Sequence, residues 1–172
     1  MASLIYGDRV SNDLGKDPSS GRDETEAERL DRNLAELLQE LRVALPGVQV
    51  LFAFLLAVPF QKRFGEITSF QESIYFVVLL ATAISAALLI APTAYHRVTF
   101  RLQRKEELVR LSNRLAIVGL GFLALAMTGA IVLITNFLYS TVLTVVAGIL
   151  AAGMFIGLWY LLPVWERNRL SE

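Results

Sequence analysis

Four long stretches of the chain contain no Lys, Arg, Asp or Glu and are rich in aliphatic and aromatic residues. They cover residues 43–61, 73–95, 115–135 and 141–165. The shortest would be roughly 28 Å long as an α-helix, close to the ~30 Å hydrocarbon core of a bilayer. Because backbone groups in lipid must form their hydrogen bonds within the segment, each stretch is predicted to be a transmembrane helix. We therefore expect an all-α membrane protein with a four-span bundle over residues 43–165.

A helical pattern of leucines precedes the first apolar stretch, over residues 23–42. The leucines recur every three or four residues and fall on one face of a helix, with charged and amide residues on the other face. They are Leu30, Leu34, Leu37, Leu38 and Leu41. This pattern predicts an amphipathic interfacial helix. Pro46 then either begins a new helix or lies within one helix that continues from residues 23–42, and the sequence leaves both open.

The two ends of the chain carry no apolar run. Residues 1–22 mix charged residues with Gly, Ser and Pro and lack the apolar core of a cleavable signal peptide. We expect them to be a disordered tail, and residues 166–172 to be a short C-terminal tail.

The composition agrees with a membrane protein and excludes several kinds of site. Hydrophobic residues make up 55% of the chain and charged residues 19%, against about 45–50% and about 25% in soluble domains. The formal net charge is zero, which gives no general attraction for nucleic acid. Since there is no cysteine, disulfides, thiolate metal sites and cysteine nucleophiles are excluded.

The basic residues predict the orientation. The connector at residues 97–114 contains six Lys and Arg residues, whereas the connector after the first span has only Lys62 and Arg63 and the last connector has none. Short basic loops stay in the cytoplasm. We therefore expect both termini to be cytoplasmic.

Opposite charges predict a contact between residues 23–42 and residues 97–114. The first segment has seven acidic and three basic residues, a net charge of −4, and the second has six basic and two acidic residues, a net charge of +4. We expect the helix to dock at the cytoplasmic mouth near this connector, with its leucines on the protein or in the lipid interface. The alternative is a helix that merely lies flat on the membrane.

This docking gives a candidate polar cluster at the cytoplasmic mouth: Glu36, Glu40, His96, Arg97 and Arg101. In one interpretation His96 or Arg97 pairs with Glu40 as a charge clamp. In the other, His96 is an interfacial residue that forms one hydrogen bond to a neighbouring helix. A lone histidine without cysteine or a second histidine is a poor metal site.

Residues 24–60, ETEAERLDRNLAELLQELRVALPGVQVLFAFLLAVPF, carry a resemblance together with LLIAPTAYHRVTFR at residues 88–101 and NRL at residues 113–115. In content and order these motifs resemble a bacterial family of small four-span membrane proteins of unknown function. The resemblance covers roughly residues 24–135 and implies a multi-pass protein of the bacterial inner membrane. It implies no functional residues. Some relatives bear an automatic sodium:proton antiporter label.

Polar and small residues inside the spans suggest helix packing rather than ion transport. Antiport normally needs an ionisable group at membrane depth, and none lies in the four stretches. We expect Gln49 to face another helix, where its amide can be paired, or alternatively to line a polar pore. Gly153 and Gly157 have the four-residue spacing that lets helix backbones approach closely, either within the bundle or in a homodimer.

The sequence contains no motif of a known enzyme chemistry. HExxH, a Walker loop, GxSxG and a GxGxxG after a strand are all missing, so we expect no enzyme, no catalytic residue, no cofactor and no metal. The leading hypothesis is a non-enzymatic accessory or membrane-organising subunit that acts through its cytoplasmic helix and basic connector. Its expected partners are the lipid bilayer, anionic lipid headgroups at residues 97–114, and another membrane protein or a second copy. The alternative is a small oligomeric transporter or channel.

Overall fold

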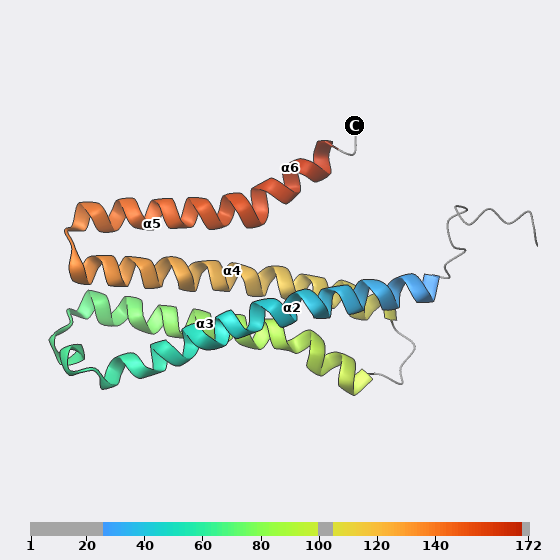
Figure 1. Ribbon diagram of the computed structural model, residues 1–172, viewed down its shortest axis with the longest axis horizontal. Helices are drawn as coiled ribbons and strands as arrows, with labels where there is room; N and C mark the ends of the chain where they lie inside the picture. The colour runs from blue at the N-terminus through green and yellow to red at the C-terminus, as the bar shows by residue number, and fades with distance from the viewer. Residues whose placement is uncertain (1–25, 100–104, 170–172) are drawn as a thin grey trace, which may run out of the picture.

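The computed structural model describes residues 26–99 and 105–169, which form helices and no β-strand (Figure 1). The α-helices are α2 (Glu26–Ala57), α3 (Ser69–Thr99), α4 (Lys105–Leu138), α5 (Thr141–Ile156) and α6 (Leu162–Arg169). Two short 3₁₀ turns, η1 (Val58–Phe60) and η2 (Lys62–Glu66), join α2 to α3, and a π-helical turn, η3 (Gly157–Leu161), joins α5 to α6. The all-α prediction is confirmed. The predicted disordered tail at residues 1–22 lies outside the described residues.

Four helices are long and apolar enough to cross a membrane, which indicates a multi-pass membrane protein. They cover Glu28–Phe60, Ser69–Tyr95, Glu107–Leu138 and Thr141–Arg169. Three of them include a whole apolar stretch and extend beyond it, while the first begins well before its stretch and ends at Phe60, one residue short of the end of that stretch. The helices extend past the stretches because charged residues that flank a span are compatible with a helical backbone in water. The predicted C-terminal tail is accordingly helical as far as Arg169, and residues 170–172 lie outside the described residues.

Helix α2 contains both the leucine-rich segment and the first span. It runs unbroken from Glu26 to Ala57 with Pro46 inside it. Of the two possibilities that the sequence left open, the continuous helix is the one observed. A proline inside a helix loses one backbone hydrogen bond, and this loss interrupts neither the segment before it nor the span after it.

Helix α4 has the central position in the bundle. It contacts α2, α3 and α5, and α2 also contacts α3. Among the described residues, α5 contacts α4 and its own continuation η3, but neither α2 nor α3. Figure 1 shows α3 and α5 on opposite sides of α4, with α2 crossing α3 and α4. The spans therefore form a three-helix group with α5 attached to one side of it.

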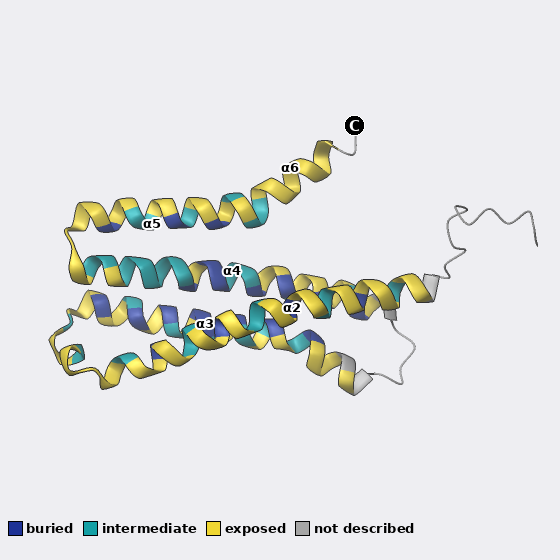
Figure 2. Cartoon of the chain, in the orientation of Figure 1, coloured by how far each residue is buried: buried dark blue, intermediate teal, exposed yellow. Residues whose placement is uncertain are grey.

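Small residues allow these close approaches. A methyl group added at any of three glycines would overlap a side chain of the neighbouring helix. The pairs are Gly119 with Leu89, Gly129 with Val78, and Gly148 with Val132. Helices in lipid associate largely through such van der Waals packing, since lipid is as apolar as their side chains. Figure 2 shows the buried residues on the faces that α3 and α4 turn toward their neighbours, whereas α6 is exposed throughout.

The last span changes direction at its C-terminal end. Pro163 has no N–H to donate to the preceding turn, and the widened turn η3 comes immediately before α6. Kinks commonly occur at prolines and at π-turns, and Figure 1 shows α6 leaving the direction of α5. The hydroxyl of Tyr160 in η3 donates to the backbone oxygen of Ile117 at 2.8 Å, which fixes this turn against α4.

Candidate functional site

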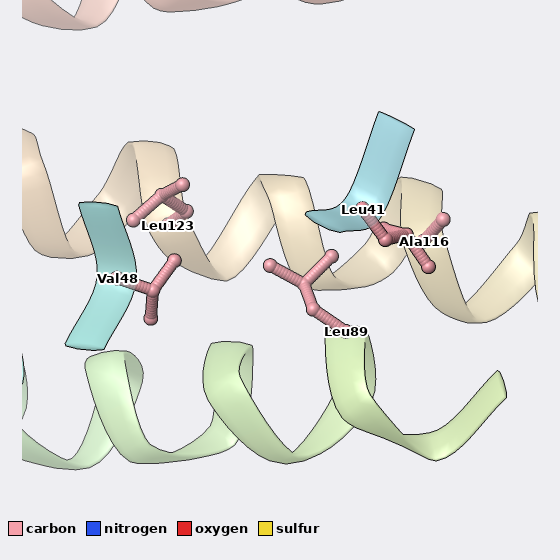
Figure 3. Close-up of a cluster of buried hydrophobic side chains, with 5 residues drawn as sticks. All are labelled: Leu41, Val48, Leu89, Ala116 and Leu123. Carbon is pink, nitrogen blue, oxygen red and sulfur yellow. The ribbon is translucent and has the colours of Figure 1, made fainter. Parts of the chain in front are cut away.

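One end of the molecule, here called the basic end, contains residues 26–42 of α2, the last turn of α3 and residues 105–114 of α4. The leucine face of α2 packs on protein at this end. Leu34 and Leu41 are buried, and Leu41 and Val48 form a cluster with Leu89 of α3 and two residues of α4, Ala116 and Leu123 (Figure 3). The charged face of α2 therefore points away from the bundle.

Glu36 and Glu40 lie on this outward face. Both are exposed, and a carboxylate oxygen of Glu36 lies 3.8 Å from Nε of Arg32, one turn earlier on the same helix. Arg97 is also exposed, and no ion pair joins it to Glu40 within the described part of the chain. Because buried Leu41 turns toward α4, the preceding residue turns outward, and the Glu40–Arg97 half of the predicted clamp does not form.

The remaining members of the predicted cluster cannot be placed with their neighbours. The backbone of His96 belongs to α3, but its side chain lies outside the described residues, and so does the whole of Arg101. The structure thus brings Glu36 and Glu40 onto one surface and does not place the five residues together.

Ser112 is an unpaired polar group inside the basic end. Its side chain is 1% exposed, and in residues 26–99 and 105–169 its Oγ is the buried side-chain oxygen without a hydrogen-bond partner. It lies one turn from Ala116 on the face of α4 that is buried. By contrast, Ser85 of α3 donates to the backbone oxygen of Gly119 on α4 at 2.8 Å.

Gln49 does not pack inside the bundle formed by the described residues, and its predicted contact with another helix stays a prediction for a helix of a second chain. It is exposed, while the adjacent Val48 is fully buried. One residue turns a helix by about 100°, so the burial of Val48 points the neighbouring amide outward. The pore-lining alternative likewise stays a prediction.

Gly153 is exposed and Gly157 is partly buried, and neither permits the close helix contact within the described bundle that their spacing had suggested. A side-chain carbon added at either position would meet no atom within 4 Å. The described glycines that do permit close contact with a neighbouring helix or turn are those at 119, 121, 129 and 148. The homodimer alternative for Gly153 and Gly157 stays a prediction.

At the other end of the molecule, here called the opposite end, there is a cavity that sequence reasoning did not anticipate. Its volume is about 690 Å³, and it is bounded by η1, η2, the first turns of α3 and the last turns of α4. Apolar and aromatic side chains form most of its wall, including Val58, Phe64, Leu133 and Phe137, while Lys62 and Arg63 supply cations. Pockets of this size and character commonly hold small molecules.

Hydrogen bonds and ring contacts hold the walls of this cavity in place. Gln71 is buried, and its amide nitrogen donates to Oδ1 of Asn136 at 3.0 Å, joining α3 to α4. The Tyr75 hydroxyl donates to the backbone oxygen of Leu55 at 2.9 Å, joining α3 to α2. Phe64 packs edge-on against Tyr75, with ring centroids 5.3 Å apart. A polar residue just outside each of two spans, Gln71 and Asn136, was the signal in the sequence that could have indicated this pairing.

Metal binding finds no support in the geometry of the described residues. Within residues 26–99 and 105–169, no three His, Asp or Glu side chains gather closely enough to hold an ion.

Residues 23–163 match the sequence profile of a family described as "Family of unknown function (DUF6328)". The chain belongs to this family. The match includes the leucine-rich segment of α2, the first three apolar stretches and the fourth as far as residue 163. The family of unknown function expected from the sequence motifs is therefore confirmed. No curated protein and no solved structure matches the chain.

Proposed function

We propose that this protein is a non-enzymatic membrane component that binds another protein through the charged face of α2 at the basic end, in an accessory or membrane-organising role. The observation that carries this proposal is the continuity of α2. One helix passes from the charged segment into the first span, so a partner bound outside the membrane is coupled rigidly to the spans.

The burial of the leucine face supports the same proposal. Because Leu34 and Leu41 are buried and Leu37 packs against the same cluster, the centre of the leucine face is occupied by protein rather than by lipid. The exposed acidic residues of α2, among them Glu36 and Glu40, are therefore available to a partner with a complementary basic surface. We infer that this surface lies in the cytoplasm, since the arginine-rich residues 97–114 flank it.

A pull-down with charge-reversed variants tests the proposal. Tagged protein is purified from native membranes as the wild type, as Glu36→Lys/Glu40→Lys, and as Glu66→Lys/Glu72→Lys. The last variant makes the same charge change at exposed positions of the opposite end. We expect the same partner to co-purify with the wild type and with the control, Glu66→Lys/Glu72→Lys. Its recovery with Glu36→Lys/Glu40→Lys should fall at least tenfold, because lysines would then face the basic surface of the partner.

Two results would contradict the proposal. One is an identical set of co-purified proteins from all three forms. The other is sodium or proton movement by the purified protein in sealed vesicles, which would favour the alternative of a small oligomeric transporter.

A further inference from the structure

The cavity at the opposite end extends across the edge of the predicted hydrocarbon region. Val58, Leu133 and Ile134 on its wall belong to the apolar stretches 43–61 and 115–135, and Lys62 and Arg63 come directly after the first of these. One part of the cavity therefore lies at the depth of acyl chains. The part near η2 lies at the depth of headgroups.

The two cations are available to a ligand. Among the described residues no carboxylate pairs with Lys62 or Arg63, and the nearby acids Glu66 and Glu72 are exposed and do not line the cavity. The guanidinium of Arg63 lies 5.3 Å from the ring centre of Phe137. This cation–π contact orients the charge at the margin of the cavity.

The side chains of Gln71 and Tyr75 on the wall already form hydrogen bonds within the protein. Gln71 donates to Asn136 and accepts a hydrogen bond from the backbone N–H of Thr68. The Tyr75 hydroxyl is bonded to the backbone of Leu55. An apolar wall with two unpaired cations at one margin thus selects a molecule with an apolar body and an anionic head.

We propose that this cavity binds one anionic phospholipid from the surrounding bilayer, with its phosphate at Lys62 and Arg63 and an acyl chain along Leu133 and Ile134. A soluble anion would leave the apolar wall unfilled. A second copy of the chain, related by two-fold symmetry, would bring the same cations together. A membrane lipid satisfies both the charge and the depth of the site.

Native mass spectrometry of the full chain tests this proposal. The protein is reconstituted in phosphatidylcholine containing a minor fraction of phosphatidylglycerol, extracted, and the retained lipids are identified. Two variants alter the site: Lys62→Gln/Arg63→Gln removes its two positive charges, and Ile134→Trp fills its apolar part. Two controls match them: Arg114→Gln/Arg167→Gln removes two exposed cations elsewhere, and Ile149→Trp enlarges an exposed residue of α5.

We expect the wild type and both controls to retain one phosphatidylglycerol molecule. In both site variants the fraction of protein with this bound lipid should fall at least tenfold, while the unfolding temperature stays unchanged. Equal retention of phosphatidylcholine and phosphatidylglycerol by the wild type would overturn the proposal. So would equal losses in site variants and controls, since these would indicate attraction to surface charge in general. Retention of a protein or peptide in place of lipid would overturn it as well.

Discussion

Glycines in this chain differ in what surrounds them. Gly129 of α4 lies directly against Val78 of α3, whereas Gly153 of α5 has open space where a side chain would begin. Valine is branched at Cβ and has little rotational freedom in a helix, so Val78 cannot easily move aside. The same substitution at these two glycines should therefore have opposite effects.

We expect Gly129→Ala to lower the free energy of unfolding by about 1–3 kcal/mol, the usual cost of overpacking a filled interior. Gly153→Ala should leave it unchanged or raise it by up to about 1 kcal/mol, because alanine favours the helical backbone over glycine. Circular dichroism during thermal unfolding in detergent measures both. An equal loss of stability in the two variants would contradict the packing described here.

The outward positions of Gln49 and Gly153 show what sequence patterns miss at the level of residues. Charge-free length identifies a span, but in lipid both the packed and the exposed faces are apolar, so periodicity does not indicate which side of a span faces its neighbours. The pairing of Gln71 with Asn136 depends on the relative position of α3 and α4. Neither residue alone predicts that position.

Among the elements, α2 joins a water-exposed segment to a span without a hinge. The apolar stretches predicted the spans well, because the cost of placing charges in lipid limits them sharply. They did not predict where the helices end, because outside the membrane a helix ends where its capping and packing end. At the basic end the packing of Leu34 and Leu41 extends α2 well beyond the first span.

Disrupting this packing should loosen the first turns of α2 and leave the spans intact. We expect Leu34→Glu/Leu41→Glu to speed amide hydrogen exchange in residues 28–42 at least tenfold, because each variant side chain would place a charge in a buried site. Exchange in residues 73–95 should be unchanged. The control, Ala35→Glu/Arg42→Glu, changes exposed positions of the same segment. Protection of residues 28–42 that survives the leucine substitutions would show that the segment does not depend on α4.

At the scale of the whole molecule, basic residues are unevenly distributed between the two ends. At the opposite end, the connector between α2 and α3 and the connector between α4 and α5 contain few basic residues, whereas the basic end contains many. We expect alkaline phosphatase fused after Arg110 to be inactive, since the enzyme needs export, and the same reporter fused after Glu66 or Tyr139 to be active. Green fluorescent protein at these positions should give the complementary result. Export of the reporter fused after Arg110 would reverse the proposed orientation of the protein.

The rigid extension of α2 and α4 also separates two electrostatic environments. Residues 26–42 of α2 add roughly 25 Å beyond the first span and residues 105–114 of α4 roughly 15 Å beyond the third, at 1.5 Å per residue. At physiological ionic strength the Debye length is only about 8 Å. Ions therefore screen the outermost charges of α2 from the phosphates of the lipid surface. Arg114, which comes directly before the third apolar stretch, remains within the electric field of these phosphates. Changes in lipid composition should therefore act on charges close to the spans, such as Arg114 and Glu40, and leave the outermost charges of α2, such as Glu28, unaffected.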